Sequence, residues 1–509
     1  MDNEVSFKYT SNIDGVSNYQ NFLHYDPHAF NYSIQSDLNA TPGTIIAPLD
    51  DNMSFRSGIP PRQRAVFNSG FALIGVGGLL APILTILILL LVLYVLFFLL
   101  IAWRCFLVLI GICVRLSNRG QGLVRGDDLK RPIYSILMPV YREAAVMPQI
   151  ARVLSELNWP ADKIDVQILL EEDDHETISA ARAAPFPRNT RLTIVPEGGP
   201  RTKPNALNYG LERAYGDFVT IYDAEDVPHP DQLQAVFNAF SHISKTTVCL
   251  QCPLVADNSS ASWISAQWGL EYDVQFGLLL PALATYRMPL LIGGTSNHFR
   301  KSALLALGGW DAWNVTEDAD LGIRIARAGL NTGTITMPTF EDAPTQVGIW
   351  VSQRSRWIKG FMQTWLVLMR EPRTAFRQLG FVRFHATQFT LGGAILAPVL
   401  FLPCSLLLLI ALASDLFQIG VLGTSLLISA IITGLIGDLV APQPWTWSKV
   451  FAALTRWIYW PLHSIAAYLA LWELAKRPFF WAKTPHRPRS AETDPPCSTG
   501  LSASASPLD

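Results

Sequence analysis

Charged residues are scarce in this chain, and neither sign dominates. Of the 509 residues, 16% are charged and 50% are hydrophobic, which leaves too few charges for an ordinary soluble protein. The net charge of −2 gives no support to binding of nucleic acid, so we expect no nucleic-acid partner. The first sixty residues are polar, and we therefore expect no cleavable signal peptide. These shortages favour a protein that is partly embedded in a lipid bilayer.

Cysteine is also infrequent, with six residues scattered along the chain. Cys249 and Cys252 form a C-x-x-C inside an expected strand, but no second pair of ligands follows at the spacing of a zinc site. We therefore interpret both cysteines as core residues.

Apolar runs of membrane-span length flank a block of globular composition. Residues 1–61, rich in Asn, Ser, Asp and Tyr, are expected to form a disordered cytosolic arm. Residues 62–116 are long enough for a hairpin of two spans, since one span needs about 20 residues. Gly77, Gly78 and Pro82 mark the expected turn, and arginines on both flanks favour cytoplasmic ends. One long tilted helix is the alternative.

The second apolar region, residues 380–475, is expected to hold three or four spans. A simple count gives three, but the tail at 476–509 is rich in Lys and Arg and is therefore expected in the cytosol. An even number satisfies both observations, so we expect Pro398 and Pro403 to divide the first stretch into two passes. That gives six spans in all.

The block between the apolar regions alternates strands with helices. Buried strands are expected at four short apolar runs, 135–140, 166–170, 192–195 and 218–222. The alternation predicts an α/β fold with a Rossmann-like, mostly parallel sheet over residues 131–345, followed by amphipathic interface helices over 346–378. Ligands of such sheets bind at the carboxyl ends of the strands, where acidic groups stand at 171–174 and 223–226.

Four polar motifs follow one another in a fixed order through this block. They are Leu170-Glu171-Glu172-Asp173-Asp174, Asp223-Ala224-Glu225-Asp226, Thr316-Glu317-Asp318 and Gln353-Arg354-Ser355-Arg356-Trp357. In this order, and between apolar spans, they resemble the motifs of the family 2 inverting glycosyltransferases, whose catalytic domain has the GT-A fold. The resemblance covers residues 132–360 and is greatest to the processive membrane branch, the cellulose, curdlan and β-glucan synthases.

The resemblance implies an enzyme of the bacterial inner membrane with its catalytic domain in the cytoplasm. It implies a UDP-sugar donor, UDP-glucose by default, and a growing polysaccharide, a β-glucan, that the protein passes across the membrane. Accessory export proteins are further expected partners. Two alternatives stay open: a non-processive glycosyltransferase that adds a single sugar to a lipid, and a catalytically inactive receptor or scaffold on the same fold.

Carboxylates after the fourth expected strand are predicted to hold Mg²⁺ or Mn²⁺. Asp223 and Glu225 point to the same side of an extended chain. Oxygen ligands suit these ions, which neutralise a leaving diphosphate. The family usually has Asp at the third position of this motif, so either Glu225 or Asp226 is expected as the second ligand.

Thr316-Glu317-Asp318 is typical of a helix N-terminus, with Thr316 as the cap and acidic residues in the first turn. The resemblance implies in addition that Asp318 is the base that removes the acceptor's proton. The acceptor contacts that it implies are Thr295, Ser296, Glu317 and Trp357. His298 stands in the same loop as Thr295, and a core position explains it equally well.

Nucleotide-sugar contacts complete the expected site. The resemblance places them at Tyr141, Glu143, Glu171, Asp173, Asp174, Lys203, Asp223, Gln353, Arg356, Trp357, Trp481 and Lys483. Two extra glutamates leave the register of the first motif open, and we favour Asp173 and Asp174 over Glu171.

Several residues of the expected site have a physical reading of their own. Lys203 opens a helix and can meet a phosphate, with a surface lysine as the alternative. Arg354 and Arg356 can both pair with phosphate oxygens. Trp481 and Lys483 resemble a gating segment, with a membrane anchor as the alternative.

Overall fold

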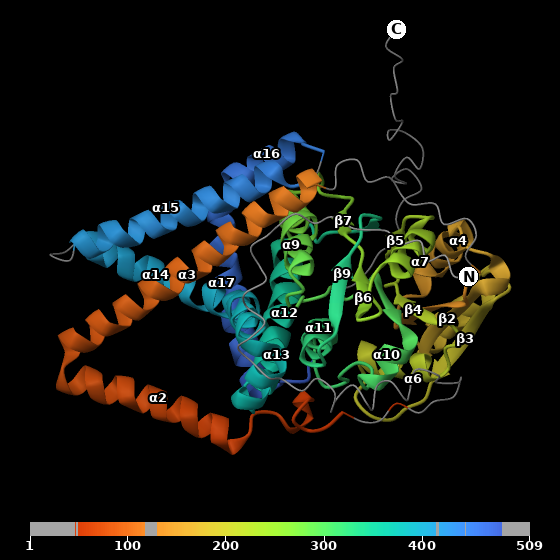
Figure 1. Ribbon diagram of the computed structural model, residues 1–509, viewed down its shortest axis with the longest axis horizontal. Coiled ribbons are helices and arrows are strands. Elements are labelled where there is room, and N and C mark those ends of the chain that lie inside the picture. Colours follow the sequence, from red (N-terminus) through yellow and green to blue (C-terminus); the bar gives the residue numbers. More distant parts are fainter. Residues whose placement is uncertain (1–45, 47–48, 118–129, 414–416, 443, 481–509) are drawn as a thin grey trace, which may run out of the picture.

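A seven-stranded sheet forms the centre of the globular block (Figure 1). The computed structural model describes residues 46, 49–117, 130–413, 417–442 and 444–480. The strand order is β3-β2-β1-β4-β8-β6-β9, with the bounds β1 (Tyr134–Val140), β2 (Ile164–Glu171), β3 (Thr190–Val195), β4 (Phe218–Ile221), β6 (Thr247–Gln251), β8 (Asn297–Arg300) and β9 (Asn331–Thr334). β8 is antiparallel to both neighbours and the other pairs are parallel. The predicted mostly parallel α/β sheet is therefore confirmed.

A second sheet of three short strands extends the carboxyl edge. Its order is β5-β10-β7, with the bounds β5 (Val227–Pro228), β10 (Thr339–Glu341) and β7 (Leu254–Ala256). β5 follows directly on the 223–226 motif, so this small sheet fixes the chain just after the acidic turn.

Alternate side chains of the strands build two hydrophobic layers, one on each face of the large sheet. In β1, Ile136 and Met138 pack with α4, α5 and α7, whereas Leu137 packs with α6, α9 and α11. Cys249 and Cys252 lie inside these two layers, which confirms their interpretation as core residues. The helices and short turns of the block are η2 (Ala144–Val146), α4 (Met147–Glu156), η3 (Ala161–Lys163), α5 (His175–Ala183), α6 (Lys203–Glu212), α7 (Gln232–His242), α8 (Trp263–Val274), η4 (Gln275–Leu279), α9 (Leu280–Thr285), α10 (Lys301–Ala306) and α11 (Glu317–Arg327).

Helices before and after this block account for the rest of the described chain. They are η1 (Phe55–Ser57), α2 (Pro61–Leu80) and α3 (Pro82–Ser117) on the amino side, and α12 (Val347–Leu368), α13 (Pro372–Thr387), η5 (Gln388–Gly392), α14 (Gly393–Leu412), α15 (Phe417–Val440), α16 (Trp447–Leu454) and α17 (Arg456–Lys476) on the carboxyl side. α12 carries the fourth motif, and it packs against both α11 and α17.

The last part of the amino-terminal arm is ordered against the globular block. The Ser54 hydroxyl donates to Asp311 Oδ1 at 2.7 Å, and the Phe55 amide donates to Asp311 Oδ2 at 2.9 Å. The Phe55 side chain is 1% exposed. The expectation of a disordered arm over 1–61 is thus wrong for this part, because a buried aromatic ring and a carboxylate hold it in place.

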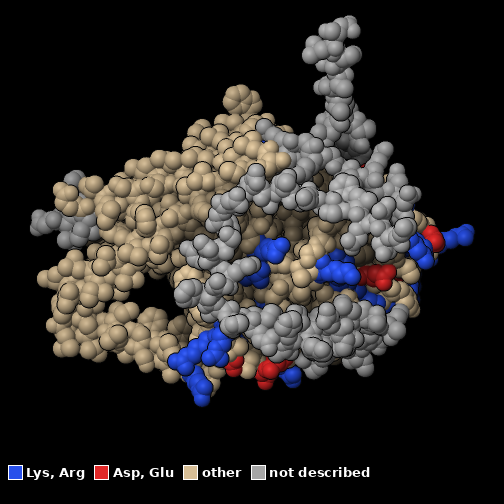
Figure 2. Space-filling view, in the orientation of Figure 1, with Lys and Arg blue, Asp and Glu red and all other residues tan. Residues whose placement is uncertain are grey.

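Two helical hairpins extend away from the large sheet, α2 with α3 and α14 with α15 (Figure 1). Three helical stretches of the described chain are long and apolar enough to cross a membrane, namely Pro82–Ser117, Pro372–Leu412 and Gly420–Val440. Away from the base of α2, Figure 2 shows an uncharged surface over the hairpins, and Leu79 and Leu80 are among the most exposed large hydrophobic side chains. The first hairpin turns at Ala81, next to the expected Pro82, whereas Gly77 and Gly78 lie inside α2.

The carboxyl-terminal apolar region differs from the expectation of three or four spans. α14 continues through Pro398 and Pro403, so these prolines do not divide it into two passes. α17 is not among the span-length apolar helices; it lies along α12 and contacts the globular block near both ends. Trp263 Nε1 donates to Thr455 Oγ1 at 2.8 Å, and Lys359 Nζ donates to Glu473 Oε2 at 2.8 Å.

Each helical hairpin leaves the globular block and returns to it (Figure 1). After the span-length stretches Pro372–Leu412 and Gly420–Val440, α17 brings the chain back along α12. The start of the tail is consequently held beside α12, where Gln363 Nε2 donates to the Pro478 carbonyl. Trp481 and Lys483 lie outside the described residues.

Candidate active site

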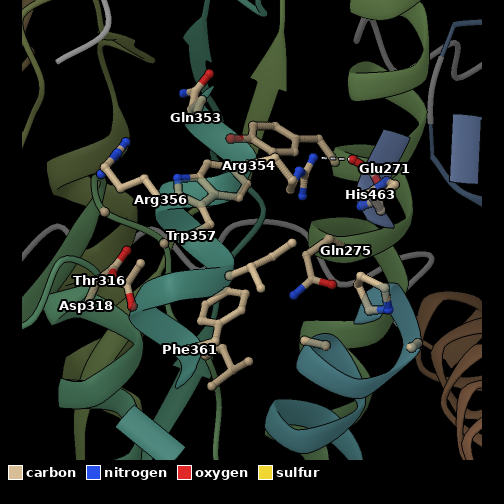
Figure 3. A pocket seen from close by; sticks show the side chains of 18 of the residues that line it. Glu271, Gln275, Thr316, Asp318, Gln353, Arg354, Arg356, Trp357, Phe361 and His463 are labelled. Atoms are coloured by element: carbon tan, nitrogen blue, oxygen red, sulfur yellow. Dashed lines mark hydrogen bonds and ion pairs between the residues drawn. The ribbon is translucent and has the colours of Figure 1, made fainter. Parts of the chain in front are cut away.

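One cavity connects the carboxyl edge of the large sheet to the span-length helices. Its volume is about 1280 Å³. Glu171, Asp223 and Asp318 line one end, and side chains of α3, α14 and α15 line the other. Figure 3 shows Thr316 and Asp318 on one side, Glu271 and His463 on the opposite side, and Trp357 with Arg354 between them.

The acidic turn after β4 presents two of its three carboxylates to this cavity. Asp223 and Glu225 line it, whereas Asp226 is 2% exposed and faces the interior. Asp226 Oδ2 accepts hydrogen bonds from the Asp223 amide, at 2.7 Å, and from the Thr295 hydroxyl. Burial, reinforced by Asp223 and Glu225, raises the pKa of Asp226 well above its ordinary value. The turn therefore uses Asp226 to hold its shape and leaves Glu225 as the better second ligand.

Lys203 stands at the first position of α6 and reaches the same turn. Its Nζ donates to Asp223 Oδ1 and, at 2.8 Å, to the Gly294 carbonyl. Burial alone would lower the pKa of Lys203, but the carboxylates of Asp223 and Glu317 raise it above its ordinary value. The ammonium group is thus charged and fixed at the cavity wall, so the alternative of an unconstrained surface lysine is wrong.

The acidic run after β2 has the opposite register from the one we favoured. Glu171, the last residue of β2, lines the cavity, and Asp173 and Asp174 do not. Asp174 caps α5 by accepting from the Thr177 amide, and it also accepts from the Arg142 amide, where the backbone has a positive φ of 55°. Asp173 pairs with Arg201 at 2.7 Å. Burial and Asp173 raise the pKa of Glu171 to about 7.

Asp318 occupies the first turn of α11, as the motif predicts. Its Oδ1 accepts from the Ala319 amide at 2.8 Å. Burial raises the pKa of Asp318 above its ordinary value, although Lys203 and Arg356 oppose this. Burial and Asp318 together raise the pKa of the neighbouring Glu317 to about 7. Two carboxylates with raised pKa values, close to two cations, form the most perturbed group at this end of the cavity, which is typical of an active site.

The two arginines of the fourth motif have different surroundings. Arg356 lines the cavity close enough to Glu317, Asp318 and Asp223 to interact electrostatically with all three. Arg354 instead forms an ion pair with Glu271 at 2.5 Å, and its guanidinium carbon lies 4.7 Å from the centre of the Trp357 ring. The expectation that Arg354 pairs with phosphate is therefore wrong, because Glu271 already holds it.

Gln353 and Trp357 line the cavity on the same helix as Arg356. The buried Gln353 Oε1 has no hydrogen-bond partner among the described residues. Trp357 packs against Trp268 with ring centres 5.0 Å apart. The ring is consequently held from behind by Trp268 and Arg354 and presents a flat apolar surface to the cavity, between Asp318 and Glu271 (Figure 3).

Several residues that sequence reasoning missed hold α12 against the first turn of α11. A Cβ atom added to Gly360 would lie 2.2 Å from Thr316 Oγ1, so only glycine permits this approach. Gln363 Oε1 accepts from the Val315 amide at 3.0 Å, and Thr364 Oγ1 accepts from Asn314 at 2.9 Å. The signal in the sequence was a glycine inside an amphipathic helix, one turn after Arg356.

The expected acceptor contacts in the loop before β8 differ in whether they face the cavity. Thr295 lines the cavity, whereas the buried Ser296 hydroxyl donates to Thr339. Gly294 passes close to the base, since an added Cβ would lie 3.3 Å from Asp318 Oδ2. His298 is a core residue that contacts Tyr134 and Gln232, and burial lowers its pKa to about 3. Tyr141 and Glu143, after β1, also line the cavity.

The donor set at this edge suits a divalent metal ion that is shared with a substrate. No cluster of three or more ligating side chains occurs within the described ranges. Asp223 and Glu225 supply two carboxylates at the cavity wall. Mg²⁺ commonly takes one or two carboxylates and completes its shell with phosphate oxygens and water, so these residues fit such an ion without forming a closed cage.

Comparison with known proteins agrees with this geometry. Residues 132–360 match the model of the family described as glycosyltransferase like family 2. Residues 132–360 are a family 2 glycosyltransferase domain. The sheet described above is accordingly of the GT-A type, and the described residues place its motifs at the same cavity edge.

Relatives of this domain act on different acceptors, as their names state. The chain is 26% identical over 284 residues to a beta-monoglucosyldiacylglycerol synthase of Synechocystis sp., covering 53% of this chain and 58% of that protein. It is 24% identical over 254 residues to a UDP-forming cellulose synthase catalytic subunit of Xanthomonas axonopodis pv. citri, covering 48% of this chain and 34% of that protein. The match thus spans little more than half of the first relative's length.

Among solved structures, the chain is similar to a mannosyltransferase of Pyrobaculum calidifontis in complex with GDP-Man and Mn²⁺. The sequence identity is 18% and the TM-score is 0.47, with coverage of 75% of this chain and 99% of that one. At this score the likeness is weak.

Proposed function

We propose that this chain is a membrane-embedded inverting glycosyltransferase that moves a sugar from a nucleotide-sugar donor to a lipid acceptor. The observation that carries the proposal is the single cavity that joins Asp223, Lys203 and Asp318 to the apolar space between α3, α14 and α15. A donor at the sheet edge and an amphiphilic acceptor from the membrane side would meet at Asp318. UDP-glucose is the default donor, and the cytoplasmic side of a bacterial inner membrane is the expected place.

The residues at the sheet edge supply the chemistry of a single displacement. Asp318 accepts the proton of the acceptor hydroxyl, whose oxygen bonds to the anomeric carbon while the bond from that carbon to the diphosphate breaks. An α-linked donor then gives a β-linked product. Lys203 and Arg356 stabilise the charge that develops on the departing nucleoside diphosphate. A metal ion held by Asp223 and Glu225 would add Lewis-acid stabilisation of that diphosphate.

A lipid acceptor follows from the lining of the membrane end. Between the helices the cavity wall consists mostly of Leu, Ile, Phe, Ala and Gly side chains from α3, α14 and α15. Two hydroxyls there are already used within their own helices, since Ser405 donates to the Phe401 carbonyl and Thr433 to the Ser429 carbonyl. Sugar hydroxyls would lose their hydrogen bonds to water in this space, whereas acyl chains would lose nothing.

A polymerising enzyme is the second candidate. The cavity runs from the base toward the span-length helices, the direction that an exported β-glucan would take, and Trp357 offers a platform for a terminal sugar. The likeness to a cellulose synthase catalytic subunit supports this candidate. It requires a polar path between α3, α14 and α15, and the described lining there is mostly apolar, so we rank it below the lipid acceptor.

Release of nucleoside diphosphate tests the proposal. Purified full-length protein would be incubated with each common nucleotide sugar and Mg²⁺ or Mn²⁺, with and without lipid vesicles. We expect release that depends on both metal and lipid, and we expect Asp318→Asn to abolish it. Release that is equal without lipid and yields a long glycan would favour the polymerase. No release with any nucleotide sugar would favour an inactive scaffold on the same fold and overturn the proposal.

A further inference from the structure

Five helices bring charged side chains together at the boundary between the apolar end of the cavity and the globular block. Arg104 comes from α3, Glu271 from α8, Arg354 from α12, Asp438 from α15, and Arg456 and His463 from α17. All of these except Asp438 line the cavity. We call this group the boundary cluster. It lies across Trp357 from Asp318 (Figure 3), and so it is separate from the residues assigned to the donor.

Most charges of the boundary cluster are paired within it. Glu271 pairs with Arg354 and accepts from Tyr459 at 2.9 Å, and His463 Nε2 lies 3.3 Å from Glu271 Oε1. Asp438 pairs with Arg456 at 2.8 Å. Arg104 is the exception. Although it is near enough to Asp438 and Glu271 for electrostatic interaction, it makes no hydrogen bond or ion pair with any residue in the described part of the chain.

The position of Arg104 along α3 matches the depth of a lipid phosphate. Residues 82–102 contain no charge, and a run of about 20 residues spans the hydrocarbon core. Arg104 follows at the end nearest the globular block, where α3 begins to pack against it through the buried Leu107 and Val108. Arg104 is half-buried in the wall of the cavity, where a charge without a hydrogen-bonded partner is costly.

We propose that the acceptor is a lipid carrying a phosphate, which the Arg104 guanidinium binds while the acyl chains lie between α3, α14 and α15. Guanidinium and phosphate oxygens form paired, charge-assisted hydrogen bonds. The partly unsatisfied Arg456, whose Nε has no hydrogen-bond partner among the described residues, adds a second cation at the same wall. A headgroup hydroxyl beyond the phosphate then points past Trp357 toward Asp318. This inference rests on the proposed function, because it specifies the acceptor of that reaction.

The test measures lipid binding without a donor, so that it is independent of transfer. Two fluorescent probes with identical acyl chains, one a phosphatidylglycerol and one a diacylglycerol, would be titrated against the full chain in detergent micelles. We expect the phosphatidylglycerol probe to bind at least about tenfold more tightly, the effect of one hydrogen bond to a charged group. We expect inorganic phosphate not to displace it, because the acyl chains supply most of the affinity.

Variants assign the preference to Arg104. Arg104→Gln should lose the tenfold preference and leave diacylglycerol binding unchanged, and Arg104→Lys should keep most of it. Arg373→Gln, which removes an exposed arginine of α13, is the matched control and should change neither. Equal binding of the two probes by the wild type, displacement by inorganic phosphate, or an Arg104→Gln variant that loses thermal stability but keeps the preference would overturn the inference.

Transfer is then measured separately with unlabelled lipids. If phosphatidylglycerol binds as expected but no nucleotide sugar releases its diphosphate, the proposed function fails while the lipid site stands. If sugar is transferred to diacylglycerol and to phosphatidylglycerol equally well, the proposed function stands and the phosphate-bearing acceptor is wrong.

Discussion

The two ends of the cavity are built from opposite kinds of side chain. At the sheet edge, Asp223, Lys203, Glu317 and Asp318 are crowded together. Burial raises the pKa values of both α11 carboxylates, and Asp318 raises that of Glu317 further. At the membrane end, the hydroxyls of Ser405 and Thr433 are taken up inside their own helices and apolar side chains form the wall. The proposed reaction would use this difference by bringing two chemically unlike substrates together at α12, which contributes Arg356 to one end and Trp357 to the middle.

Removal of the proposed base, Asp318, should have the largest effect on activity. Asp318→Asn keeps the shape of the side chain but cannot accept a proton, so we expect turnover to fall by about 10²–10⁴-fold, the usual contribution of general base catalysis. Binding of the nucleoside diphosphate, measured by calorimetry, should be kept. Glu176→Gln, which removes an exposed carboxylate of α5, is the control and should be fully active. A variant that retains a tenth of the wild-type rate would exclude this role for Asp318.

A shift of α12 should misalign the two ends of the cavity without changing the side chains at either end. Gly360→Ala places a Cβ atom 2.2 Å from Thr316 Oγ1, so the helix or the first turn of α11 must shift. Displacement by about 1 Å can cost about 10²-fold in rate. Gly348→Ala in the same helix has open space at its Cβ and should be neutral. If both variants have equal kcat values and melting temperatures, the close approach at Gly360 is not what aligns Asp318 with Arg356.

The metal assignment predicts unequal effects within one acidic turn. Asp223→Asn should weaken nucleoside diphosphate binding about tenfold or more when Mg²⁺ or Mn²⁺ is present, through loss of one charged ligand, and should have little effect in EDTA. Asp226→Asn should retain at least about half of the activity. Burial raises the pKa of Asp226 well above its ordinary value, which disfavours the charged form, and an amide oxygen can accept the same hydrogen bonds. The reverse order of effects would identify Asp226 as the ligand.

The smallest effect on activity is expected when the pH of the assay is changed. Burial and Asp318 raise the pKa of Glu317 to about 7, and burial raises the pKa of Asp318. A base must be ionised, so the rise of kcat/KM with pH should lie above the ordinary aspartate pKa of about 3.9. Glu317→Gln should leave this rise in place, because Glu317, with a pKa of about 7, is still uncharged at the pH where Asp318 ionises. A rise that moves to lower pH in this variant would mean that Glu317 is charged there and repels Asp318.

The raised pKa of Glu317 also predicts how the free energy of unfolding changes with pH. The folded protein holds the Glu317 proton up to pH of about 7, whereas the unfolded chain releases it near 4.5. The unfolded state therefore binds fewer protons between these values, and the contribution of Glu317 to the free energy of unfolding falls as the pH rises through this window. Thermal melts of wild type and Glu317→Gln across the window would measure the difference.

The sheet and the helix start at Asp318 could be predicted from the sequence because they depend on local patterns. Buried strands such as β1 read as continuous apolar runs, and Thr316 with two acidic residues is a local helix start. The register at 171–174 could not be predicted, because it depends on the Arg142 amide from another strand end, which takes Asp174 as its acceptor. The place of α17 could not be predicted for a similar reason, since its packing along α12 depends on contacts with a distant segment.

The residues that link the two ends of the cavity could also not be predicted from local patterns in the sequence. No residue near Arg354 in the sequence indicates that Arg354 pairs with Glu271 on α8. Gly360 is visible as a glycine in a helix, but its closeness to Thr316 appears only when α11 and α12 are placed together. Contacts between distant segments, rather than motifs, thus determine which of the polar residues face the cavity.

Analysis of the product tests the central claim most directly, namely that a sugar from the charged end is transferred to a lipid from the apolar end. The full chain in vesicles would be incubated with the nucleotide sugar that supports diphosphate release, and the organic extract examined by mass spectrometry and proton NMR. The account predicts one sugar added to a lipid, β-linked, and none with Asp318→Asn. A water-soluble glycan of many sugars with no lipid-borne product, or an α-linked sugar, would contradict it.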